Sequence, residues 1–485
     1  MLVRRTRTTA LAALALLNAF TLAAGLVVAR MLPPRLARLH VAAAAARPVV
    51  NATPVLPSLG TGNSLTQSTV PTTISGIGAM LSGKLTPSAT GKGIGVEVED
   101  AATGRVLYSV NASTPATPAS TTKVVTAVAA LGTLGPEARF TTSVSQVGGT
   151  IVLVGGGDPT LAVNAYPSSD YPRPATLAQL AASTARALKA QGRHSVRLGY
   201  DTTLFSGPDM APGWGNDLIT TGNVTPIAAL TADQGRLTPS GALQDSDDGT
   251  NYRPRATKPV EVTTAAFATL LRGDGIKVTG TAGPVTPPAT APTVASVASP
   301  PLVQMVEQML LESNNVIAEV LARHVAIALK MPATFAGAAG ADVAELRRLG
   351  VTTPASLVDG SGLSAKDAIA PETLVRVLKL AQDTPRLRGA ITGLPVAGFA
   401  GTLSPGNSVF GEIGKLGDGT ARGVVRAKTG NLSTVATLAG LVSDRSGRLL
   451  LFAIMAPRVP GAGQLQAAAD AIDSAAAGLA GCGCS

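Results

Sequence analysis

The chain is short of the residues on which many enzymes depend. Its 485 residues include three histidines, two cysteines and one tryptophan, and charged residues make up only 14%. The histidines His40, His194 and His324 stand far apart and are interpreted as tether, surface or packing residues, so neither a Ser-His-Asp triad nor a zinc peptidase site is predicted. Cys482 and Cys484 fall in the final four residues, which excludes an internal disulfide framework.

Basic charge is scarce outside the N-terminal segment. Seven arginines lie in the first 47 residues, which contain no acidic residue, whereas the remainder carries 32 basic against 29 acidic residues. A nucleic-acid-binding protein needs a basic face on its folded body. We therefore predict no nucleic-acid partner.

An apolar run over residues 10–29 follows the cationic stretch Arg4-Arg5-Thr6-Arg7, which is typical of an export element. The run is long enough to span a bilayer, which takes about 20 residues. We predict that residues 1–30 are a signal sequence or a membrane anchor, with an uncleaved anchor favoured, and that the protein is extracytoplasmic. The Ala/Pro/Ser/Thr-rich residues 31–75 are interpreted as a tether.

The remaining sequence predicts an α/β fold. A strand hairpin is expected over residues 93–110, and its strands should complete an antiparallel sheet with three C-terminal strands. The expected elements elsewhere are strands at 150–154, 424–430, 435–442 and 449–456, helices at 177–190, 266–271, 302–311 and 464–479, and a proline-rich connector at 284–301. The glycines of residues 155–157 predict a tight turn, since no Gly-Lys-Ser/Thr follows them. The predicted domains are residues 76–139 and 291–480, interrupted by an inserted region of one or two small domains at 140–290 and followed by a tail at 481–485.

One serine stands three residues before a lysine at a predicted helix start. Pro118 suits the first helical turn, and the apolar residues that follow Lys123 predict a buried helix. Ser120 and Lys123 then lie on one face of that helix. A serine hydroxyl needs a base within hydrogen-bond reach, and a desolvated lysine amine can be that base. We predict Ser120 as the nucleophile and Lys123 as its base.

Two further motifs follow in the chain. The helix at 302–311 breaks at Glu312-Ser313-Asn314-Asn315, either as a polar cap between two helices or as a loop that carries Ser313 and Asn315 into a cleft. Near the C-terminus, a strand ends at Lys428-Thr429-Gly430. Ser-x-x-Lys, Ser-x-Asn and Lys-Thr-Gly in this order are the signature of penicillin-binding proteins and related β-lactamases.

Acyl transfer gives each motif residue a role. Besides the roles of Ser120 and Lys123, we predict that Ser313, with Lys428 nearby, provides a proton route to the leaving amine. Asn315 is predicted to hold a substrate carbonyl, Lys428 and Thr429 to bind a substrate carboxylate, and Gly430 to let the substrate lie against the strand edge. The backbone N–H groups of Ser120 and Asn431 are predicted to form the oxyanion hole. No cofactor or metal is predicted.

Over residues 80–480 the chain resembles the D-alanyl-D-alanine carboxypeptidase/endopeptidase group of low-molecular-mass, class C penicillin-binding proteins, peptidase family S13. Besides the three motifs and the long insertion between the first two, the resemblance rests on Gly155-Gly156-Gly157-Asp158-Pro159-Thr160-Leu161, Asp359-Gly360-Ser361-Gly362-Leu363-Ser364, Leu394-Pro395-Val396-Ala397-Gly398 and Gly401-Thr402-Leu403. The family pattern has an acidic residue before the last of these, where this chain has Phe399-Ala400.

The resemblance implies a transpeptidase-like domain whose antiparallel sheet is flanked by helices. It also implies hydrolysis of the terminal D-Ala-D-Ala bond of peptidoglycan stem peptides, possible cleavage of cross-bridges, and stable acylation of Ser120 by β-lactams. A serine β-lactamase would share the three motifs, but no residue that activates water for fast deacylation is identified. A non-catalytic cell-wall-binding or penicillin-sensing module is the alternative from another class.

Overall fold

The structure, a computed structural model, describes residues 74–165, 171–238, 241, 243, 253–405, 409–410 and 419–482. The predicted signal or anchor, all but the last two residues of the tether, and Cys484 lie outside the described residues. Among the residues that are described, no helix is both long and apolar enough to cross a membrane.

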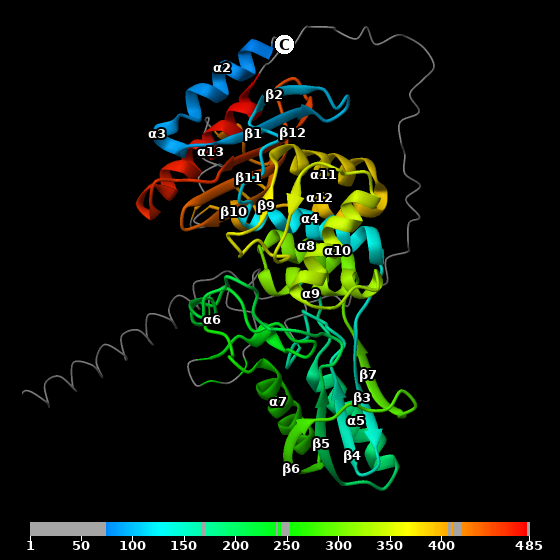
Figure 1. Ribbon diagram of the computed structural model, residues 1–485. Coiled ribbons are helices and arrows are strands. Elements are labelled where there is room, and N and C mark those ends of the chain that lie inside the picture. The colour runs from blue at the N-terminus through cyan, green and yellow to red at the C-terminus, as the bar shows by residue number, and fades with distance from the viewer. Residues whose placement is uncertain are drawn as a thin grey trace, which may run out of the picture. The chain divides into compact units, whose positions relative to one another are not determined.

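Two five-stranded sheets organise the described chain, and the first joins its N- and C-terminal parts (Figure 1). In spatial order its strands are β10 (Val425–Leu432), β11 (Val435–Ser443), β12 (Leu449–Ala456), β1 (Gly95–Asp100) and β2 (Val106–Val110). All neighbours are antiparallel. The predicted hairpin and the three predicted C-terminal strands are thus confirmed, as is their pairing into one sheet.

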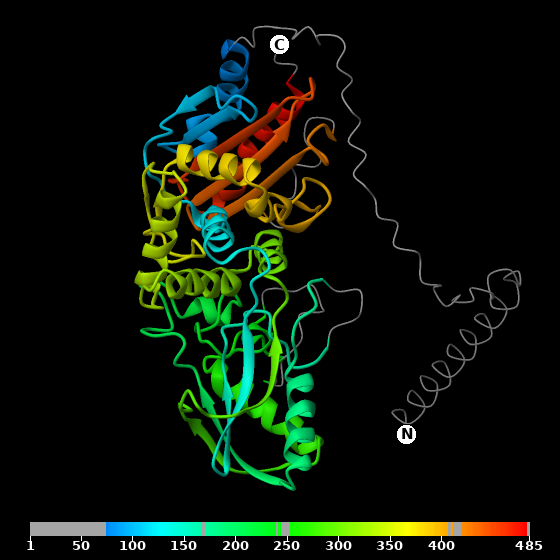
Figure 2. The same ribbon diagram turned by 90° about the vertical axis from the view of Figure 1, so that its right-hand side faces the viewer.

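Helices cover both faces of this sheet (Figures 1 and 2). Because strand side chains alternate, Leu450, Phe452 and Ile454 of β12 pack in one core while Leu451, Ala453 and Met455 pack in another. The first core includes α2 (Ile74–Lys84) and α13 (Leu465–Gly481), with α3 (Pro87–Thr90) against α13. The second core holds α4 (Thr122–Leu134), α8 (Leu302–Leu311), α9 (Asn315–Ala328), α10 (Phe335–Arg348), α11 (Pro371–Asp383) and α12 (Gly389–Thr392).

The second sheet comes from the middle of the chain. Its spatial order is β6 (Lys277–Pro284), β5 (Ser195–Asp201), β4 (Thr150–Val154), β3 (Thr141–Val147) and β7 (Thr293–Ala298). Strands β4, β5 and β6 are parallel, and β3 is antiparallel to both of its neighbours. Helices α5 (Leu177–Ala190) and α7 (Pro259–Gly273) contribute Leu180, Leu188 and Phe267 to the core of this sheet.

Two predictions in this region need correction. The expected helix over residues 266–271 is the C-terminal part of the longer α7, which begins at Pro259. The expected connector over residues 284–301 contains β7, an edge strand whose side chains are exposed or half-buried. An edge strand buries too little to show a strong apolar pattern, and the prolines around β7 obscured it.

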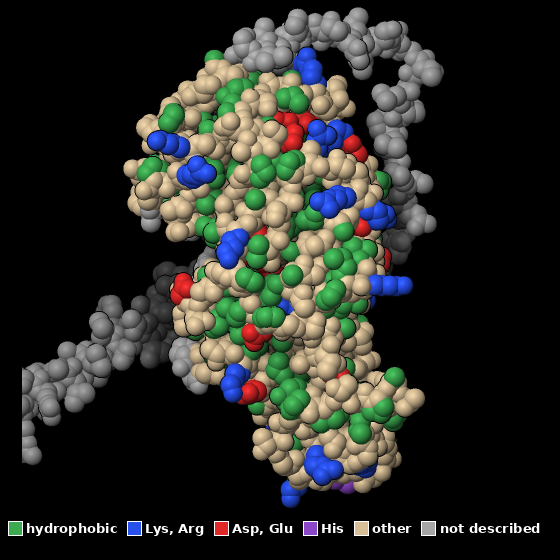
Figure 3. All heavy atoms as spheres, in the orientation of Figure 1, with side chains coloured by type: hydrophobic (Ala, Val, Ile, Leu, Met, Phe, Trp, Pro, Cys, Tyr) green, Lys and Arg blue, Asp and Glu red, His purple; other side chains and the backbone are tan. Residues whose placement is uncertain are grey.

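Short elements complete the connections: β8 (Ala355–Ser356), β9 (Ala368–Ile369), α6 (Asp217–Thr220) and the 3₁₀ turns η1 (Ala119–Thr121), η2 (Asp233–Gly235), η3 (Pro385–Leu387), η4 (Gly401–Leu403) and η6 (Ala462–Gln464). The glycines of residues 155–157 do not form the predicted tight turn: the backbone continues from β4, with Gly155 and Gly157 donating their N–H groups to the carbonyls of Asp201 at 2.9 Å and Ala229 at 2.8 Å, and the turn comes at residues 159–160. On the face in Figure 3, the basic side chains of the described residues are scattered among polar and apolar ones.

Candidate active site

Ser120 lies in η1, directly before α4, as its motif predicts. Two threonines that follow Ser120 hold the turn: Thr121 Oγ1 donates to the Pro118 carbonyl at 2.7 Å, and Thr122 Oγ1 donates to the Ala119 carbonyl at 2.9 Å. Ala119 has a φ of +49°, a conformation that costs about 1–3 kcal/mol for a residue with a Cβ. The backbone before Ser120 is therefore strained and firmly anchored.

Lys123 is fully buried one turn after Ser120. Its Nζ donates to Ser120 Oγ at 2.9 Å, to Asn315 Oδ1 at 2.6 Å and to the Ser361 carbonyl at 2.7 Å. Burial lowers the pKa of Lys123 to about 7, against the opposing effect of nearby Asp359, Glu319 and Asp367. An amine with this pKa is substantially neutral at physiological pH, so it can accept the proton of the adjacent hydroxyl.

The break between α8 and α9 serves both of its predicted purposes. Asn314 caps α9, because its Oδ1 accepts the Ile317 N–H at 3.1 Å. Ser313, with a φ of +58°, faces the cleft. Asn315 is the first residue of α9 rather than part of the break, and its Nδ2 donates to the Asn223 carbonyl at 2.9 Å. The amide is thus held so that its oxygen meets Lys123.

Lys428 comes from the edge strand β10 and is fully buried. Its Nζ donates to Ser313 Oγ at 2.9 Å and to the Thr429 carbonyl at 2.7 Å. Burial holds the pKa of Lys428 well below its usual value, and the positive charge of Lys123 lowers it further. Each of the two serine hydroxyls therefore has its own buried lysine amine.

Gly430 lies against the turn that carries Ser120. A Cβ on Gly430 would stand 2.3 Å from Thr437 Oγ1 and 2.9 Å from the Ser120 backbone nitrogen. No side chain fits there, so β10 and η1 approach closely. This contact brings the strand segment with Asn431 next to the Ser120 backbone.

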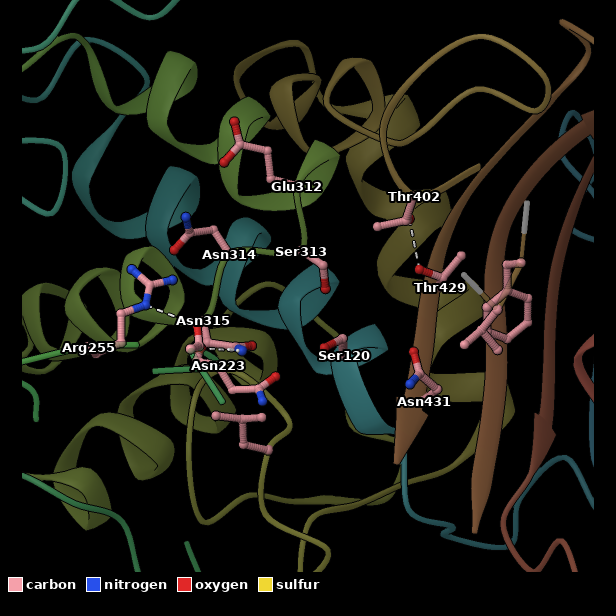
Figure 4. A pocket seen from close by; sticks show the side chains of 14 residues that line it. Ser120, Asn223, Arg255, Glu312, Ser313, Asn314, Asn315, Thr402, Thr429 and Asn431 are labelled. Carbon is pink, nitrogen blue, oxygen red and sulfur yellow. Dashed lines mark hydrogen bonds between the residues drawn. The ribbon is translucent and has the colours of Figure 1, made fainter. Parts of the chain in front are cut away.

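A cavity of about 110 Å³ opens over these groups (Figure 4). Ser120 lies at its centre, with Thr402, Thr429 and Asn431 on one side and Asn223, Arg255 and Asn315 on the other. Gly222, Glu312, Ser313, Asn314, Leu363, Val409 and Phe410 complete the lining. The two lysines do not line the cavity, since their amines lie beneath the hydroxyls that do.

The structure brings together all the predicted site residues and adds groups that the motifs did not indicate. Thr402 from η4 accepts a hydrogen bond from Thr429 Oγ1 at 2.8 Å. The stretch 359–364, quoted above without a role, supplies the Ser361 carbonyl to Lys123. Asn223 comes from the inserted region. In the sequence, these contacts were indicated only indirectly, by the family stretches at residues 359–364 and 401–403 and by the length of the inserted region.

An antiparallel sheet between helices, with these three motifs converging on one cleft, defines the class of the serine enzymes that penicillin acylates. Residues 80–251 and 233–479 match the model of the D-Ala-D-Ala carboxypeptidase 3 (S13) family. The chain belongs to this family, as its motifs predicted.

Relatives with assigned names span most of the chain. Carboxypeptidase DacB of Mycolicibacterium smegmatis is 38% identical over 399 residues, which is 80% of each chain. The D-alanyl-D-alanine carboxypeptidase of Actinomadura sp. is 30% identical over 435 residues, covering 75% of this chain and 77% of the relative. The crystal structure of penicillin binding protein 4 from Haemophilus influenzae has the same fold, with a TM-score of 0.63 at 24% identity over 82% of this chain and 98% of that one.

Proposed function

We propose that the protein is a serine-type D-Ala-D-Ala carboxypeptidase that removes the terminal D-alanine from peptidoglycan stem peptides, and that cleaves peptide cross-bridges by the same chemistry. Membership of the S13 family supports the proposal. The observation that carries it is the 2.9 Å contact between Ser120 Oγ and the Nζ of Lys123, whose pKa burial lowers to about 7.

In the acylation step, Ser120 is the nucleophile and Lys123 the general base. Lys123 takes the hydroxyl proton while Ser120 Oγ bonds to the carbonyl carbon of the penultimate D-alanine. The backbone N–H groups of Ser120 and Asn431 stabilise the charge that develops on the carbonyl oxygen; losing one such donor costs about 10²–10³ in rate. The close approach of β10 to η1 supports this pairing of donors.

Departure of the terminal D-alanine requires a proton on its nitrogen. Ser313 donates this proton as the C–N bond breaks, and Lys428, at 2.9 Å, replaces it. Water then attacks the Ser120 ester: its proton passes through Ser313 to Lys428, its hydroxyl stays on the carbonyl carbon of the released peptide, and Lys123 returns its proton to Ser120 Oγ as the ester bond breaks. The net reaction consumes one water and returns both lysines to their starting states.

The remaining motif residues hold the substrate. Asn315 uses one N–H on the Asn223 carbonyl, which leaves the other for a substrate carbonyl. Thr429 binds the terminal carboxylate from the cavity wall, with Lys428 adding positive charge from beneath. The edge position of Gly430 lets the peptide lie along β10. None of these roles requires a metal or a cofactor.

The test is labelling with a fluorescent penicillin together with release of D-alanine from a stem-peptide mimic. The wild type should retain the label for many minutes and release D-alanine, Ser120→Ala should do neither, and Ser433→Ala, which changes an exposed serine, should match the wild type. Rapid turnover of the penicillin would instead identify a β-lactamase. If the wild type neither takes up the label nor releases D-alanine, the protein would instead be a non-catalytic wall-binding or penicillin-sensing module.

We further propose an extracytoplasmic location in the cell envelope, with residues 1–30 as the export signal or membrane anchor, and the domain boundaries predicted above. The two sheets, each with its own core, support an inserted domain between the two parts of the transpeptidase-like domain. In cell fractionation, the full chain should appear in the membrane fraction, and a chain that begins at Val70 should appear in the soluble fraction. Equal partition of both chains would argue against the anchor.

A further inference from the structure

The chain's only tryptophan links the inserted region to the catalytic centre. Trp214 lies between β5 and α6, and its Nε1 donates to Asp359 Oδ2 at 2.8 Å. The indole ring also packs edge-on against Phe335 of α10, with the ring centroids 5.2 Å apart. The hydrogen bond is thus fixed by apolar packing at its donor end.

Asp359 is the residue that shapes the loop beside Lys123. Its side chain is fully buried, and besides Trp214 it accepts the backbone N–H groups of Ser361 at 3.1 Å, Gly362 at 2.7 Å and Ser364 at 2.7 Å. One carboxylate therefore folds the 359–364 loop around itself. Removing a donor to a buried carboxylate leaves a poorly compensated charge, so the loop must readjust.

The loop contacts Lys123 and the residue directly before Ser120. Its Ser361 carbonyl accepts from Lys123 Nζ at 2.7 Å. Its Gly362, with a φ of +79°, lies so close to Ala119 that an added Cβ would stand 1.8 Å from the Ala119 carbonyl oxygen. A shift of this loop therefore moves the amine of Lys123 and the turn that carries Ser120.

We infer that Trp214 is a positioning residue for catalysis: through Asp359 and the Ser361 carbonyl, the inserted region holds the Lys123 amine against Ser120. A parallel link runs from the Asn223 carbonyl through the Asn315 amide to the same amine. The inserted region is then part of the catalytic apparatus. This inference rests on the proposed function, in which Lys123 is the base.

Trp214→Phe tests the relay, because it keeps an aromatic ring next to Phe335 while it removes the N–H together with part of the indole volume. We expect acylation by a fluorescent penicillin to slow on the order of tenfold, since small displacements of reacting groups cost that much or more. With a looser Ser361 carbonyl, the charged amine loses an acceptor, so the acidic limb of the rate profile should move to lower pH. The other charged groups around the amine, Lys428, Asp359, Glu319 and Asp367, are not substituted in this variant.

Two controls separate positioning from loss of stability. Phe267→Leu loosens the core of the inserted sheet and leaves Trp214 and its packing against Phe335 unchanged, so it should lower the melting temperature without moving the acidic limb. Tyr200→Phe changes an aromatic residue of the inserted sheet away from the site and should leave labelling as in the wild type. Asp359→Asn combined with Trp214→Phe should cost no more than Asp359→Asn alone, because both changes act on one relay.

Wild-type rate and pH profile in Trp214→Phe, or additive losses in the double variant, would overturn the relay and leave the proposed function intact. Absence of labelling in the wild type would overturn both. Labelling of the wild type and not of Ser120→Ala therefore has to be established first.

Discussion

A lysine that serves as a base must lose its proton readily and still be held in place. Lys123 meets both requirements, because burial opposes its charge while three acceptors fix its nitrogen. An ammonium group can donate to all three acceptors, whereas the neutral amine has a lone pair for one of them. The acceptor that becomes a donor is Ser120, which is the proton transfer that the proposed mechanism requires.

The pKa of Lys123 fixes the direction of the pH dependence. Since this pKa is lowered to about 7 and the neutral amine is the active form, the acylation rate should rise with pH below about 7 and level off above it. Penicillin acylation rates measured from about pH 5 to about pH 9 check this. A rate that is flat or falls between about pH 6 and about pH 8 would contradict Lys123 as the base.

Replacing the amine by a permanent cation should remove the base. In Lys123→Arg, the guanidinium stays protonated, so acylation should slow by about 10²–10⁴. Lys189→Arg, at the exposed end of α5, is the matched control and should label normally. Labelling of Lys123→Arg within a few-fold of the wild type would mean that another group takes the proton.

His324 should make stability depend on pH. Its ring is buried and stacks on Phe140 at 3.6 Å, and burial lowers its pKa from 6.5 to about 4. Between these values the unfolded chain binds the proton that the folded protein excludes, so the stabilising effect of a neutral His324 is complete above about pH 6.5 and is lost as pH falls towards about 4. The stability advantage of the wild type over His324→Phe should shrink by about 2 kcal/mol from pH 7 to pH 5 in urea denaturation. Parallel losses in both proteins would rule out this role.

At this scale, the sequence predicts groups that act through side chains at fixed spacing. Ser120 and Lys123 are one helical turn apart, so their contact follows from local geometry. Ser361 acts through its backbone carbonyl, which every residue possesses, and lies 238 residues from Lys123. No side-chain pattern could have indicated that contact.

Among the elements, η1 is held between β10 on one side and the 359–364 loop on the other. Both contacts depend on glycines, Gly430 and Gly362, at which a Cβ would overlap the backbone of η1. The sequence suggested that Gly430 makes room for substrate. The structure shows that its missing side chain first makes room for the turn that carries Ser120.

Gly362→Ala and Gly447→Ala separate close contact from backbone strain. Both glycines have positive φ, +79° and +83°, but only Gly362 has atoms within reach of an added Cβ. Both variants should lose about 1 kcal/mol of stability from strain, and Gly362→Ala should in addition slow penicillin acylation at least tenfold because η1 must move. Thermal unfolding and labelling rates check both effects. Equal labelling of the two variants would show that the loop tolerates the displacement.

Long buried elements were predictable because their periodicity is strong. The α5 helix matches its expected bounds, and β12 alternates between two apolar cores. The half-exposed β7 was missed, and α7 was foreshortened because its first turns carry Glu261 and threonines among few large apolar residues. An element that is buried on one side only has a weaker apolar periodicity in its sequence, so it is harder to predict.

Across the whole molecule, the inserted region and the catalytic helices share one buried arginine. Arg323 of α9 donates to the carbonyls of Ser206 at 3.0 Å and Pro208 at 3.2 Å, and its guanidinium lies 4.4 Å from the centroid of the Phe335 ring. Such contacts between distant parts of the chain are set by the tertiary fold. The insertion itself was readable from motif spacing, but its contacts were not.

Arg323→Lys should destabilise the protein by about 2–4 kcal/mol, because an ammonium cannot reproduce the planar fork on several carbonyls. Arg348→Lys is the matched control: its side chain is 54% exposed and pairs with Glu345, so the loss should stay below about 1 kcal/mol. Chemical denaturation measures both. Similar losses in the two variants would mean that the buried fork contributes little.

A chain with a single indole carries its own optical reporter. Because Trp214 touches the carboxylate that folds the loop beside Lys123, its emission, which can be excited apart from that of the five tyrosines, reports on a ring in contact with the loop at the catalytic centre. Occupation of the cleft by a colourless ligand can thus be followed in real time without a dye, and a stopped-flow trace of that emission would time each event at Ser120 as it happens.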